Sequence, residues 1–383
     1  MSTVLLGELT ELVKIWNPIR SPEVDFCYVD LSAVDNESKT IVAPTTVAGA
    51  AAPSRARQLV TAGDVLVSTV RPNLNAVAVV PADLDGATAS TGFTVLRPGS
   101  RLDGRYLFHW VQSPAFVSDM VRKATGASYP AVSDRIVKES AIPISPLAEQ
   151  RRIAAVLDHT CALRAKRRQV LAHLDALIQS IFHDMFGDPV LNDRRLPTCR
   201  FGEVGTLDRG VSRHRPRNDP ALLGGRYPLI QTGDVANSGG YITDFTATYS
   251  EVGLAQSKLW SAGTLCITIA ANIAKAGLLT FDACFPDSVV GFTSDPNTTT
   301  YVRIWLGFVQ SSLEALASQS AQKNINLKVL RDLEVPMPDH AALANFTARV
   351  DRIHAQFAAA RQAMTTEVEL FGSLQARAFR GEL

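Results

Sequence analysis

Three residues near the start of the chain have the composition of a nuclease site. Glu23 follows a proline, and Glu37 and Lys39 lie two residues apart further along. Paired carboxylates and a lysine could hold a magnesium ion and activate a water for hydrolysis. Such short strings arise easily by chance, and the second half of the chain has no equivalent. A nuclease is therefore an alternative whose test is magnesium-dependent cleavage by the purified chain alone.

Other catalytic signatures are missing from the sequence. An amino-methyltransferase needs a tetrapeptide such as N/D-P-P-Y/F to hold a flipped base, and neither Asn17-Pro18-Ile19-Arg20 nor Asp295-Pro296-Asn297-Thr298 fits that pattern. No G-x-G-x-x-G or G-x-x-x-x-G-K-[ST] string offers a phosphate cradle. The seven histidines and five cysteines show no spacing typical of a zinc site. The sequence thus predicts a protein that is not an enzyme and has no cofactor and no metal site.

The composition is that of a folded protein with little net charge. Of the 383 residues, 46% are hydrophobic and 20% are charged, and the net charge is +1. A nucleic-acid binder with this balance must keep its positive charge in local patches. The N-terminus lacks the basic start of a signal peptide, and no run approaches the roughly 18 apolar residues of a membrane span. We expect a cytoplasmic location without membrane contact.

The elements that must position any site occur twice along the chain. Tyr106 and Trp110 match Tyr301 and Trp305 at a shift of 195 residues. The stretch 132–143 matches 325–336 at 193, 63–70 matches 263–270 at 200, and 26–36 matches 227–237 at 201. Matches that keep one order with such similar shifts indicate an internal repeat. The alternative is two unrelated domains with ordinary strand and helix patterns.

Each half has short strand-like runs followed by a helical pattern, so the fold class is α/β (α+β). Pro114 should kink or end the first of these helices. We place one globular domain at 1–145 and the other at 188–338, with a short linker at 188–198. Long helices are expected at 146–187 and 339–383.

Each long helix has one narrow apolar stripe whose steps alternate between three and four residues. The first runs through Ile153, Val156, Thr160, Leu163, Arg167, Val170, Leu174, Leu177 and Ile181. The second runs through Leu343, Phe346, Val350, Ile353, Phe357, Ala360, Met364, Phe371, Leu374 and Ala378. This spacing predicts an antiparallel two-helix coiled coil of roughly 60 Å. The alternative is that each helix packs only on its own globular half.

The helix boundaries carry recognisable signals. Ser145 is a candidate N-cap with Pro146 at the first helical position, and Gly187 is expected to end that helix. Asp339 is the candidate cap of the second helix. The first helix also carries a basic run at 164–168, which is usually no more than a solvated face.

The sequence resembles the specificity (S) subunits of type I restriction–modification systems, a form of phage defence. The resemblance is carried by IPISPLAEQRRIAAVLD (142–158), its weaker copy VPMPDHAALANFTARVD (335–351), LVSTVRPNLNAVAVV (66–80), STGFTVLRP (90–98), IQTGDV (230–235), TIAANIAKAGLL (268–279) and SAQKNINLKVLRDLEVPMP (320–338). The second helix start departs from the L-x-E-Q-x-x-I pattern of the first.

The resemblance implies two target-recognition domains separated by the antiparallel coiled coil, with a pseudo-twofold repeat. Each domain would read one half of a bipartite, asymmetric DNA target, and the helix pair would fix the gap. The partners implied are double-stranded DNA, two DNA-adenine methyltransferase (M) subunits and often restriction translocase (R) subunits. Gln150, Arg151 and Arg152 at the first helix start are the candidate partner-binding residues.

DNA recognition needs phosphate contacts for affinity and base-edge contacts for sequence. For phosphates, the densest basic cluster is Arg209, Arg213, Arg215 and Arg217, and the first half offers Arg20. For base edges, Arg suits guanine and Asn or Gln suits adenine. The candidate loop residues are Arg71, Asn73, Asn75, Lys123, Ser128 and Tyr129 in the first half, and Asn272, Lys275, Gln322, Lys323, Asn324, Asn326 and Lys328 in the second.

A different class of function stays open from the sequence alone. The chain could be a coiled-coil scaffold or interaction protein whose globular halves bind proteins rather than DNA. The salt dependence of duplex binding separates the two hypotheses. Phosphate neutralisation makes affinity fall steeply with salt, whereas a protein scaffold shows no such fall.

Overall fold

The structure is a computed structural model that describes residues 2–270, 272–318 and 324–383. The chain divides into two compact units, each of which is described by itself. Unit 1 comprises Met1–Arg168 and Arg361–Leu383, and unit 2 comprises Gln169–Ala360. Both long helices cross from one unit into the other, so each unit contains a part of each helix.

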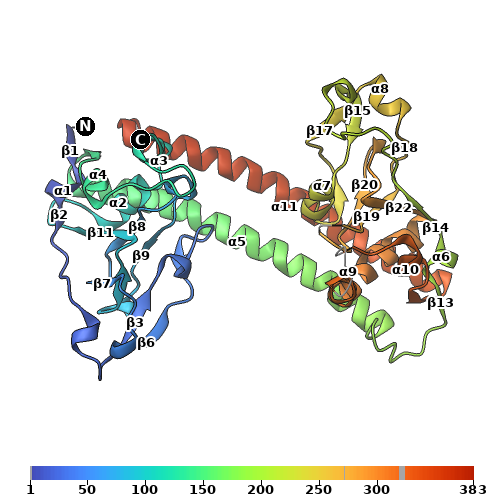
Figure 1. Cartoon of the computed structure of the whole chain (residues 1–383), viewed down its shortest axis with the longest axis horizontal. Helices are drawn as coiled ribbons and strands as arrows, with labels where there is room; N and C mark the ends of the chain where they lie inside the picture. Colours follow the sequence, from blue (N-terminus) through green and yellow to red (C-terminus); the bar gives the residue numbers. More distant parts are fainter. Residues whose placement is uncertain (1, 271, 319–323) are drawn as a thin grey trace. The chain divides into compact units, whose positions relative to one another are not determined.

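Unit 1 is built from short strands in small sheets (Figure 1). One four-stranded sheet has the order β2-β11-β8-β9, formed by Thr10–Glu11, Phe93–Pro98, Val65–Ser68 and Val77–Val79. A second has the order β6-β3-β10-β7, formed by Thr45–Ala48, Asp25–Val29, Thr88–Ser90 and Ala56–Leu59. Two-stranded pairs join β1 (Ser2–Leu5) to β12 (Ala141–Ile144) and β4 (Val34–Asp35) to β5 (Thr40–Ile41).

Unit 2 repeats this arrangement with a fifth strand in one sheet and, among its described residues, without a counterpart of the β4-β5 pair. Its five-stranded sheet has the order β14-β22-β19-β20-β16, formed by Thr206–Arg209, Val289–Thr293, Leu265–Thr268, Ala276–Leu279 and Tyr241–Ile242. The other sheet has the order β17-β15-β21-β18, formed by Ala247–Tyr249, Leu223–Leu229, Ala283–Cys284 and Leu259–Trp260. A two-stranded pair joins β13 (Thr198–Arg200) to β23 (Glu334–Pro336).

The equivalent sheet orders confirm the internal repeat that the sequence predicts. A pair of buried tyrosines shows how closely the halves correspond. The Tyr106 hydroxyl donates to the Pro143 carbonyl at 2.8 Å, and the Tyr301 hydroxyl donates to the Pro336 carbonyl. In both units this bond ties the helix after the sheet to the strand that precedes the long helix. The α/β fold class is confirmed as well.

Shorter helices cover the sheets of each unit. Unit 1 contains α1 (Leu6–Leu9), α2 (Gly104–Trp110), α3 (Pro114–Lys123) and α4 (Asp134–Lys138). Unit 2 contains α6 (Phe201–Val204), α7 (Thr232–Asn237), α8 (Glu251–Ala255), α9 (Pro296–Ser318) and α10 (Leu327–Arg331). The break between α2 and α3 falls at Pro114, as predicted, because proline cannot continue the hydrogen-bond ladder of the preceding turn.

The long helices are α5 (Leu147–Phe186) and α11 (His340–Arg380). Gly187 ends α5 with a φ of 76°, and the Asp339 carboxylate accepts from the Ala342 amide at 2.8 Å, so both of these boundary predictions are confirmed. The Ser145 cap is wrong, because the Ser145 hydroxyl is buried and has no hydrogen-bond partner in the part of the chain that the structure describes. The Gln150 side chain instead donates to the Ser145 carbonyl at 2.8 Å.

Within each unit the two long helices pack against the same core and run antiparallel. In unit 2, Phe182 and Phe186 near the end of α5 contact Phe346 near the start of α11, with ring centres 5.6 and 5.2 Å apart. In unit 1 the relation is reversed, because Arg152 near the start of α5 donates to the carbonyl of Leu383, just beyond the end of α11, at 2.8 Å. Further along the two helices, Arg167 of α5 pairs with Glu367 of α11 at 2.8 Å. The polar seam residue Arg167 therefore has a charged partner on the other helix.

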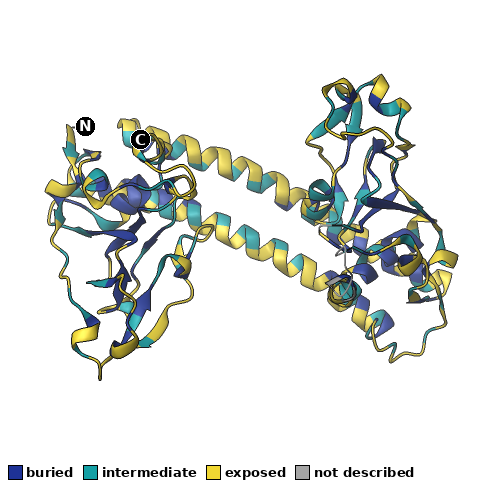
Figure 2. Cartoon of the chain, in the orientation of Figure 1, coloured by how far each residue is buried: buried dark blue, intermediate teal, exposed yellow. Residues whose placement is uncertain are grey.

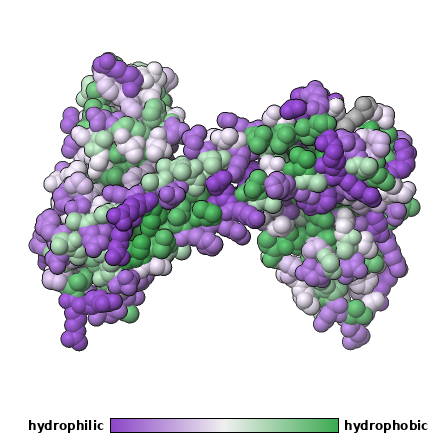
Figure 3. Space-filling model, turned by 180° about the vertical axis from the view of Figure 1, so that it is seen from behind, coloured by the Kyte–Doolittle hydropathy of each residue, from purple (hydrophilic) through white to green (hydrophobic). Residues whose placement is uncertain are grey.

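The predicted apolar seam is buried only where the globular domains cover it. Ile153 near one end of α5 and Phe182 near the other are buried, whereas Leu163, Val170 and Leu177 are between 43 and 46% exposed. Exposed residues accordingly dominate the middle of both helices (Figure 2). Apolar side chains also reach the molecular surface among polar ones (Figure 3). The seam prediction was wrong for these three positions, because heptad spacing does not report how much surface a partner covers.

An ionic cluster around the buried His109 connects α2 to α5 in unit 1. The Asp158 carboxylate lies 2.8 Å from Nε2 of the fully buried His109, and Arg105 pairs with the same carboxylate. Burial acts to raise the pKa of Asp158, but hydrogen bonds from His109 and Arg105 outweigh it and hold this pKa below its ordinary value. The ionised carboxylate therefore stabilises the fold above the unfolded-state pKa of about 4, and that contribution is lost as the pH falls.

Replacing Asp158 with asparagine is expected to lower the free energy of unfolding at neutral pH by about 1–3 kcal/mol, since His109 loses a charged partner. Urea unfolding of both proteins between pH 3 and pH 7 measures this, and the difference should shrink below about pH 4. Asp134→Asn is the control, because its ion pair with Lys138 is half exposed and should contribute less than about 1 kcal/mol. A pH-independent difference would contradict the ionic explanation.

Candidate nucleic-acid interface

In unit 1 the two predicted reading loops lie against each other. The loop after β8 contains Arg71, whose amide donates to the Pro130 carbonyl at 2.7 Å, and Val70 forms a bridge with Ala131. The Arg71 guanidinium stacks over the ring of Tyr129 at 4.6 Å from its centre. The Tyr129 side chain is 68% exposed, so the stacked pair faces solvent. Arg71 and Tyr129, 58 positions apart in the chain, thereby form one exposed surface.

Unit 2 brings its equivalent loops together in the same way. Ala270, which follows β19, forms a bridge with Asn324, and the Ile325 amide donates to the Ile269 carbonyl at 2.9 Å. These contacts correspond to Val70 and Ala131 at the shifts of 200 and 193 residues found in the sequence. Gln322 and Lys323 lie outside the described residues.

Both loops hold non-glycine residues in the left-handed region of backbone space. Arg71 and Asn75 have φ values of 50° and 47°, and Ala274 has a φ of 57°. Such conformations cost about 1–3 kcal/mol each and persist where the surrounding structure imposes them. Their presence in both reading loops, beside exposed polar side chains, favours these loops as functional positions.

Some of the residues predicted to read bases form hydrogen bonds or ion pairs that stabilise the fold. The Asn75 side chain donates to the Val111 carbonyl at 3.2 Å, and the Asn75 backbone carbonyl accepts from the Lys39 ammonium at 2.5 Å. Asn326 caps α10 by accepting from the Val329 amide at 2.9 Å, as Ser133 caps α4. The Lys123 ammonium lies 2.6 Å from Asp119.

The remaining candidates are more accessible. In unit 1, Asn73 and Ser128 are exposed beside the stacked pair. In unit 2, Asn272 and Lys328 are exposed, and the exposed Lys275 donates to Gln310 at 3.2 Å. Arg20 is exposed at the end of the 3-10 turn Pro18–Arg20. The structure therefore offers exposed polar side chains at both pairs of loops.

The arginine-rich loop of unit 2 is held in place by residues that the sequence analysis missed. Gln256 accepts from the backbone amides of Arg213 and His214 at 2.6 and 3.0 Å. Asp287 pairs with both Arg215 and Arg217, which leaves the loop less basic than its sequence indicates. Gln256 and Asp287 are distant from the loop in the sequence, so no local sequence pattern indicates that they contact it.

Two exposed arginines of the same region face no acid that the structure records. Arg209 ends β14, and Arg213 begins the loop; within the described residues neither forms an ion pair. An exposed arginine without a carboxylate partner is available to a phosphate. Of the four arginines in the cluster, these two are the stronger phosphate candidates.

The candidate partner-binding residues at the start of α5 differ in their exposure to solvent. Gln150 is fully buried and bonds the Asp103 amide and the Arg101 carbonyl at 2.9 and 3.0 Å, so its side chain joins the helix to the globular part of unit 1. Arg151 and Arg152 are exposed. A partner-binding role for this helix start therefore rests on the two arginines.

The nuclease alternative receives no support from the arrangement of its residues. Glu37 and Lys39 line one pocket of unit 1, and Glu23 is not among its lining residues. Across 2–270, 272–318 and 324–383, no three His, Cys, Asp or Glu side chains gather as a metal site would require. No described helix is both long and apolar enough to span a bilayer.

Known proteins that resemble this chain include members of type I restriction–modification systems. Residues 198–353 match the family described as the type I restriction modification DNA specificity domain. One solved chain comes from a structural study of "complex assembly and conformational transition of the type I R-M system". Its sequence is 27% identical to this chain, and the match covers 100% of this chain and 98% of that chain with a TM-score of 0.59. The chain is similar to type I specificity subunits over its whole length. The resemblance predicted from the sequence is thereby confirmed.

A solved S subunit shares the fold, and another solved subunit is similar in sequence. The S subunit from M. genitalium is 12% identical, with 99% of this chain and 96% of that chain covered at a TM-score of 0.59. The HsdS subunit from Thermoanaerobacter tengcongensis is 28% identical, with 100% and 97% covered at a TM-score of 0.46. None of the curated proteins matches this sequence.

Proposed function

We propose that this chain is the non-catalytic DNA-recognition subunit of a type I restriction–modification complex, reading a bipartite and asymmetric target. The observation that carries the proposal is the pair of equivalent reading surfaces, one in each unit. Both are formed where the loop after a central strand meets the segment before a short capped helix. The reading domains proposed are residues 1–145 and 188–338.

The side chains on the two surfaces differ although the scaffolds correspond. Unit 1 presents Arg71, Asn73 and Tyr129, whereas unit 2 presents Asn272, Lys275 and Lys328. Arg pairs best with guanine and Asn with adenine, so unlike surfaces select unlike bases. Two different half-sites make the whole target asymmetric.

The proposal includes partners that act on the DNA. The chain would bring adenine methyltransferase subunits, and in a restricting system translocase subunits, to the sequence that it reads. The match to a specificity domain and the likeness to a chain solved in a study of the type I complex support this role. Arg151 and Arg152, exposed at the start of α5, are the proposed contact on this side.

Sequencing of methylated adenines in a strain with and without this chain tests the function. We expect one two-part motif to lose its methylation when the chain is deleted and to regain it when the chain is restored. A methylation pattern that is the same in both strains would refute the proposal. Cleavage of DNA by the purified chain with magnesium would instead favour the nuclease alternative.

Duplex binding is also expected to weaken strongly with salt, which separates DNA recognition from protein scaffolding. A chain that neutralises about four to six phosphates should lose roughly two to three orders of magnitude in affinity between 50 and 200 mM salt. Fluorescence anisotropy with a labelled duplex measures this. Affinity that is absent, or indifferent to salt, would favour the scaffold hypothesis.

A further inference from the structure

Two sequence features that base reading leaves unused meet in one pocket of unit 1. The Glu37–Lys39 segment and the basic run at 164–168 lie far apart in the chain, yet both line a cavity of about 600 Å³. Arg164 and Arg168 are four residues apart on α5, so they share one helix face. Arg105 of α2 and Phe371 of α11 complete the basic and aromatic lining.

The charges in this pocket do not balance. Of the described residues that line it, four are cationic and one, Glu37, is a carboxylate. Arg168 lies 3.6 Å from Glu37, and Arg105 pairs with Asp158. For Lys39 and Arg164 the structure shows no ion pair within its described ranges.

The two unpaired cations are held by other contacts. The Lys39 ammonium donates to the Asn75 carbonyl, and burial lowers the Lys39 pKa, so an anion nearby would stabilise its charged form. The Arg164 guanidinium lies 5.2 Å from the centre of the Phe371 ring. Both groups are fixed in position while their charge stays available to a ligand.

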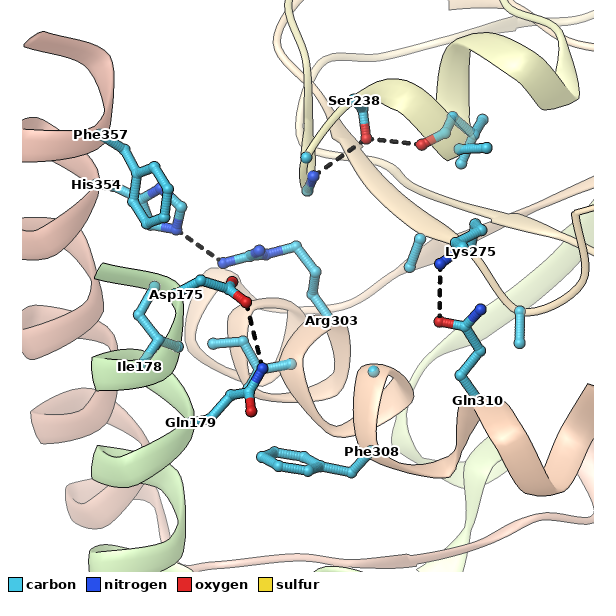
Figure 4. A pocket seen from close by; sticks show the side chains of 18 residues that line it. Asp175, Ile178, Gln179, Ser238, Lys275, Arg303, Phe308, Gln310, His354 and Phe357 are labelled. Carbon is cyan, nitrogen blue, oxygen red and sulfur yellow. Dashed lines mark hydrogen bonds between the residues drawn. The ribbon is translucent and has the colours of Figure 1, made fainter. Parts of the chain in front are cut away.

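Unit 2 contains a second pocket of about 470 Å³, whose lining also has more cationic side chains than carboxylates (Figure 4). Arg303 extends from α9 toward α11, where its guanidinium bonds Nε2 of His354 at 3.0 Å. Among the described residues, the buried Arg303 Nε has no hydrogen-bond partner. Lys275 adds a second cation across the pocket, and Asp175 is the lining carboxylate.

The two pockets occupy the same place in the repeat. By strand register Asn75 of one pocket corresponds to Ala274 of the other. The shifts of 195 and 193 found in the sequence pair Phe108 with Arg303, Gln112 with Gly307, Cys161 with His354, Arg164 with Phe357, and Ile178 with Phe371. No cation of one pocket corresponds to a cation of the other in these pairs. Each unit therefore reaches a positive balance at this place with different residues.

We propose that these paired pockets bind phosphate groups, giving each unit an anion site besides its base-reading loops. Arginine suits this ligand because its planar fork can donate two hydrogen bonds to a phosphate. The phosphate can come from the DNA backbone or from a free nucleotide, and both sources present the same charged oxygens. In unit 1 the proposal does not depend on base reading, because Arg105, Arg164 and Arg168 are not among the candidate base readers; in unit 2 the pocket shares Lys275 with the reading surface.

The test replaces Arg164 and Arg168 together with alanine in the full chain. Lys166→Ala with Arg352→Ala is the matched control, since it removes two exposed positive charges from the long helices outside both pockets. Binding of a duplex is measured by anisotropy across a salt series, and binding of inorganic pyrophosphate by calorimetry. If DNA supplies the phosphate, the slope of log affinity against log salt should fall by about 1–2 relative to the control.

If a free phosphate compound is the ligand, pyrophosphate affinity should fall at least about tenfold while the DNA slope stays unchanged. Glu37→Gln provides a second variant at an exposed position and should strengthen the same binding, because it removes the pocket's carboxylate. Equal behaviour of the pocket variants and the control in both titrations would overturn the proposal. The ratio of affinities for matched and mismatched duplexes reports separately on base reading.

Discussion

Replacing Arg71 with alanine is expected to relax recognition of one half-site and leave the other half-site unchanged. The Arg71 guanidinium is stacked on Tyr129 at 4.6 Å, and the backbone bond to Pro130 fixes the loop from which it projects. A pre-oriented guanidinium of this kind discriminates a guanine by about 1–3 kcal/mol, or roughly 5- to 150-fold. Binding to duplexes that vary one base pair at a time measures the loss.

The controls separate base reading from charge. Arg101→Ala removes the same charge from an exposed residue of unit 1 and should leave discrimination intact. Arg71→Lys keeps the charge but loses the two-pronged hydrogen bond, so it should recover affinity without recovering discrimination. If Arg71→Ala weakens binding equally for every sequence, then Arg71 contacts a phosphate and the assignment to base reading is wrong.

Replacing Phe182 with alanine is expected to lower the free energy of unfolding of unit 2 by about 3–5 kcal/mol, because it opens a cavity in an aromatic cluster. Phe182 is fully buried in α5 and packs on Tyr301, Phe308 and Phe346 at ring-centre distances of 5.2, 4.9 and 5.6 Å. These partners belong to α9 and α11. One substitution should therefore loosen both long-helix segments of this unit at once.

Hydrogen exchange read by mass spectrometry locates the effect, since a chain with two units need not unfold in a single step. The amides of 340–360 should exchange faster in Phe182→Ala. Leu177→Ala is the matched control on the same helix, and its side chain is 46% exposed, so it should cost less than about 1 kcal/mol. A Leu177→Ala cost equal to that of Phe182→Ala would mean that the seam is buried along its whole length.

Much of the architecture could be predicted because it rests on local patterns. Matched residues in the same order identified the repeat, and the Tyr106 and Tyr301 hydroxyl bonds show that matched positions make matched contacts. Helix ends were predictable where a backbone requirement selects one residue type, as at Gly187 and Asp339. Ser145 failed as a cap because its environment is set by residues distant in sequence.

The candidate site was predictable as two pairs of loops but not residue by residue. Arg, Asn and Tyr in polar loops indicate where a duplex could be read, and the bridges of Val70 with Ala131 and of Ala270 with Asn324 join those loops in the structure. Which of their side chains is available depends on neighbours elsewhere in the fold. Asn326 caps a helix.

The sequence by itself determined the duplicated α/β plan, the two long helices and the loops that face outward, since periodicity and turn chemistry act over a few residues. Only the tertiary structure decided which apolar positions are covered and which charges find a partner. Leu163 is exposed, and Arg167 pairs with Glu367, which lies two hundred residues away in the chain. Lys39 and Arg164 line the same pocket. Burial and ion pairing depend on all residues that are close in space, and the spacing of residues along the chain does not specify those neighbours.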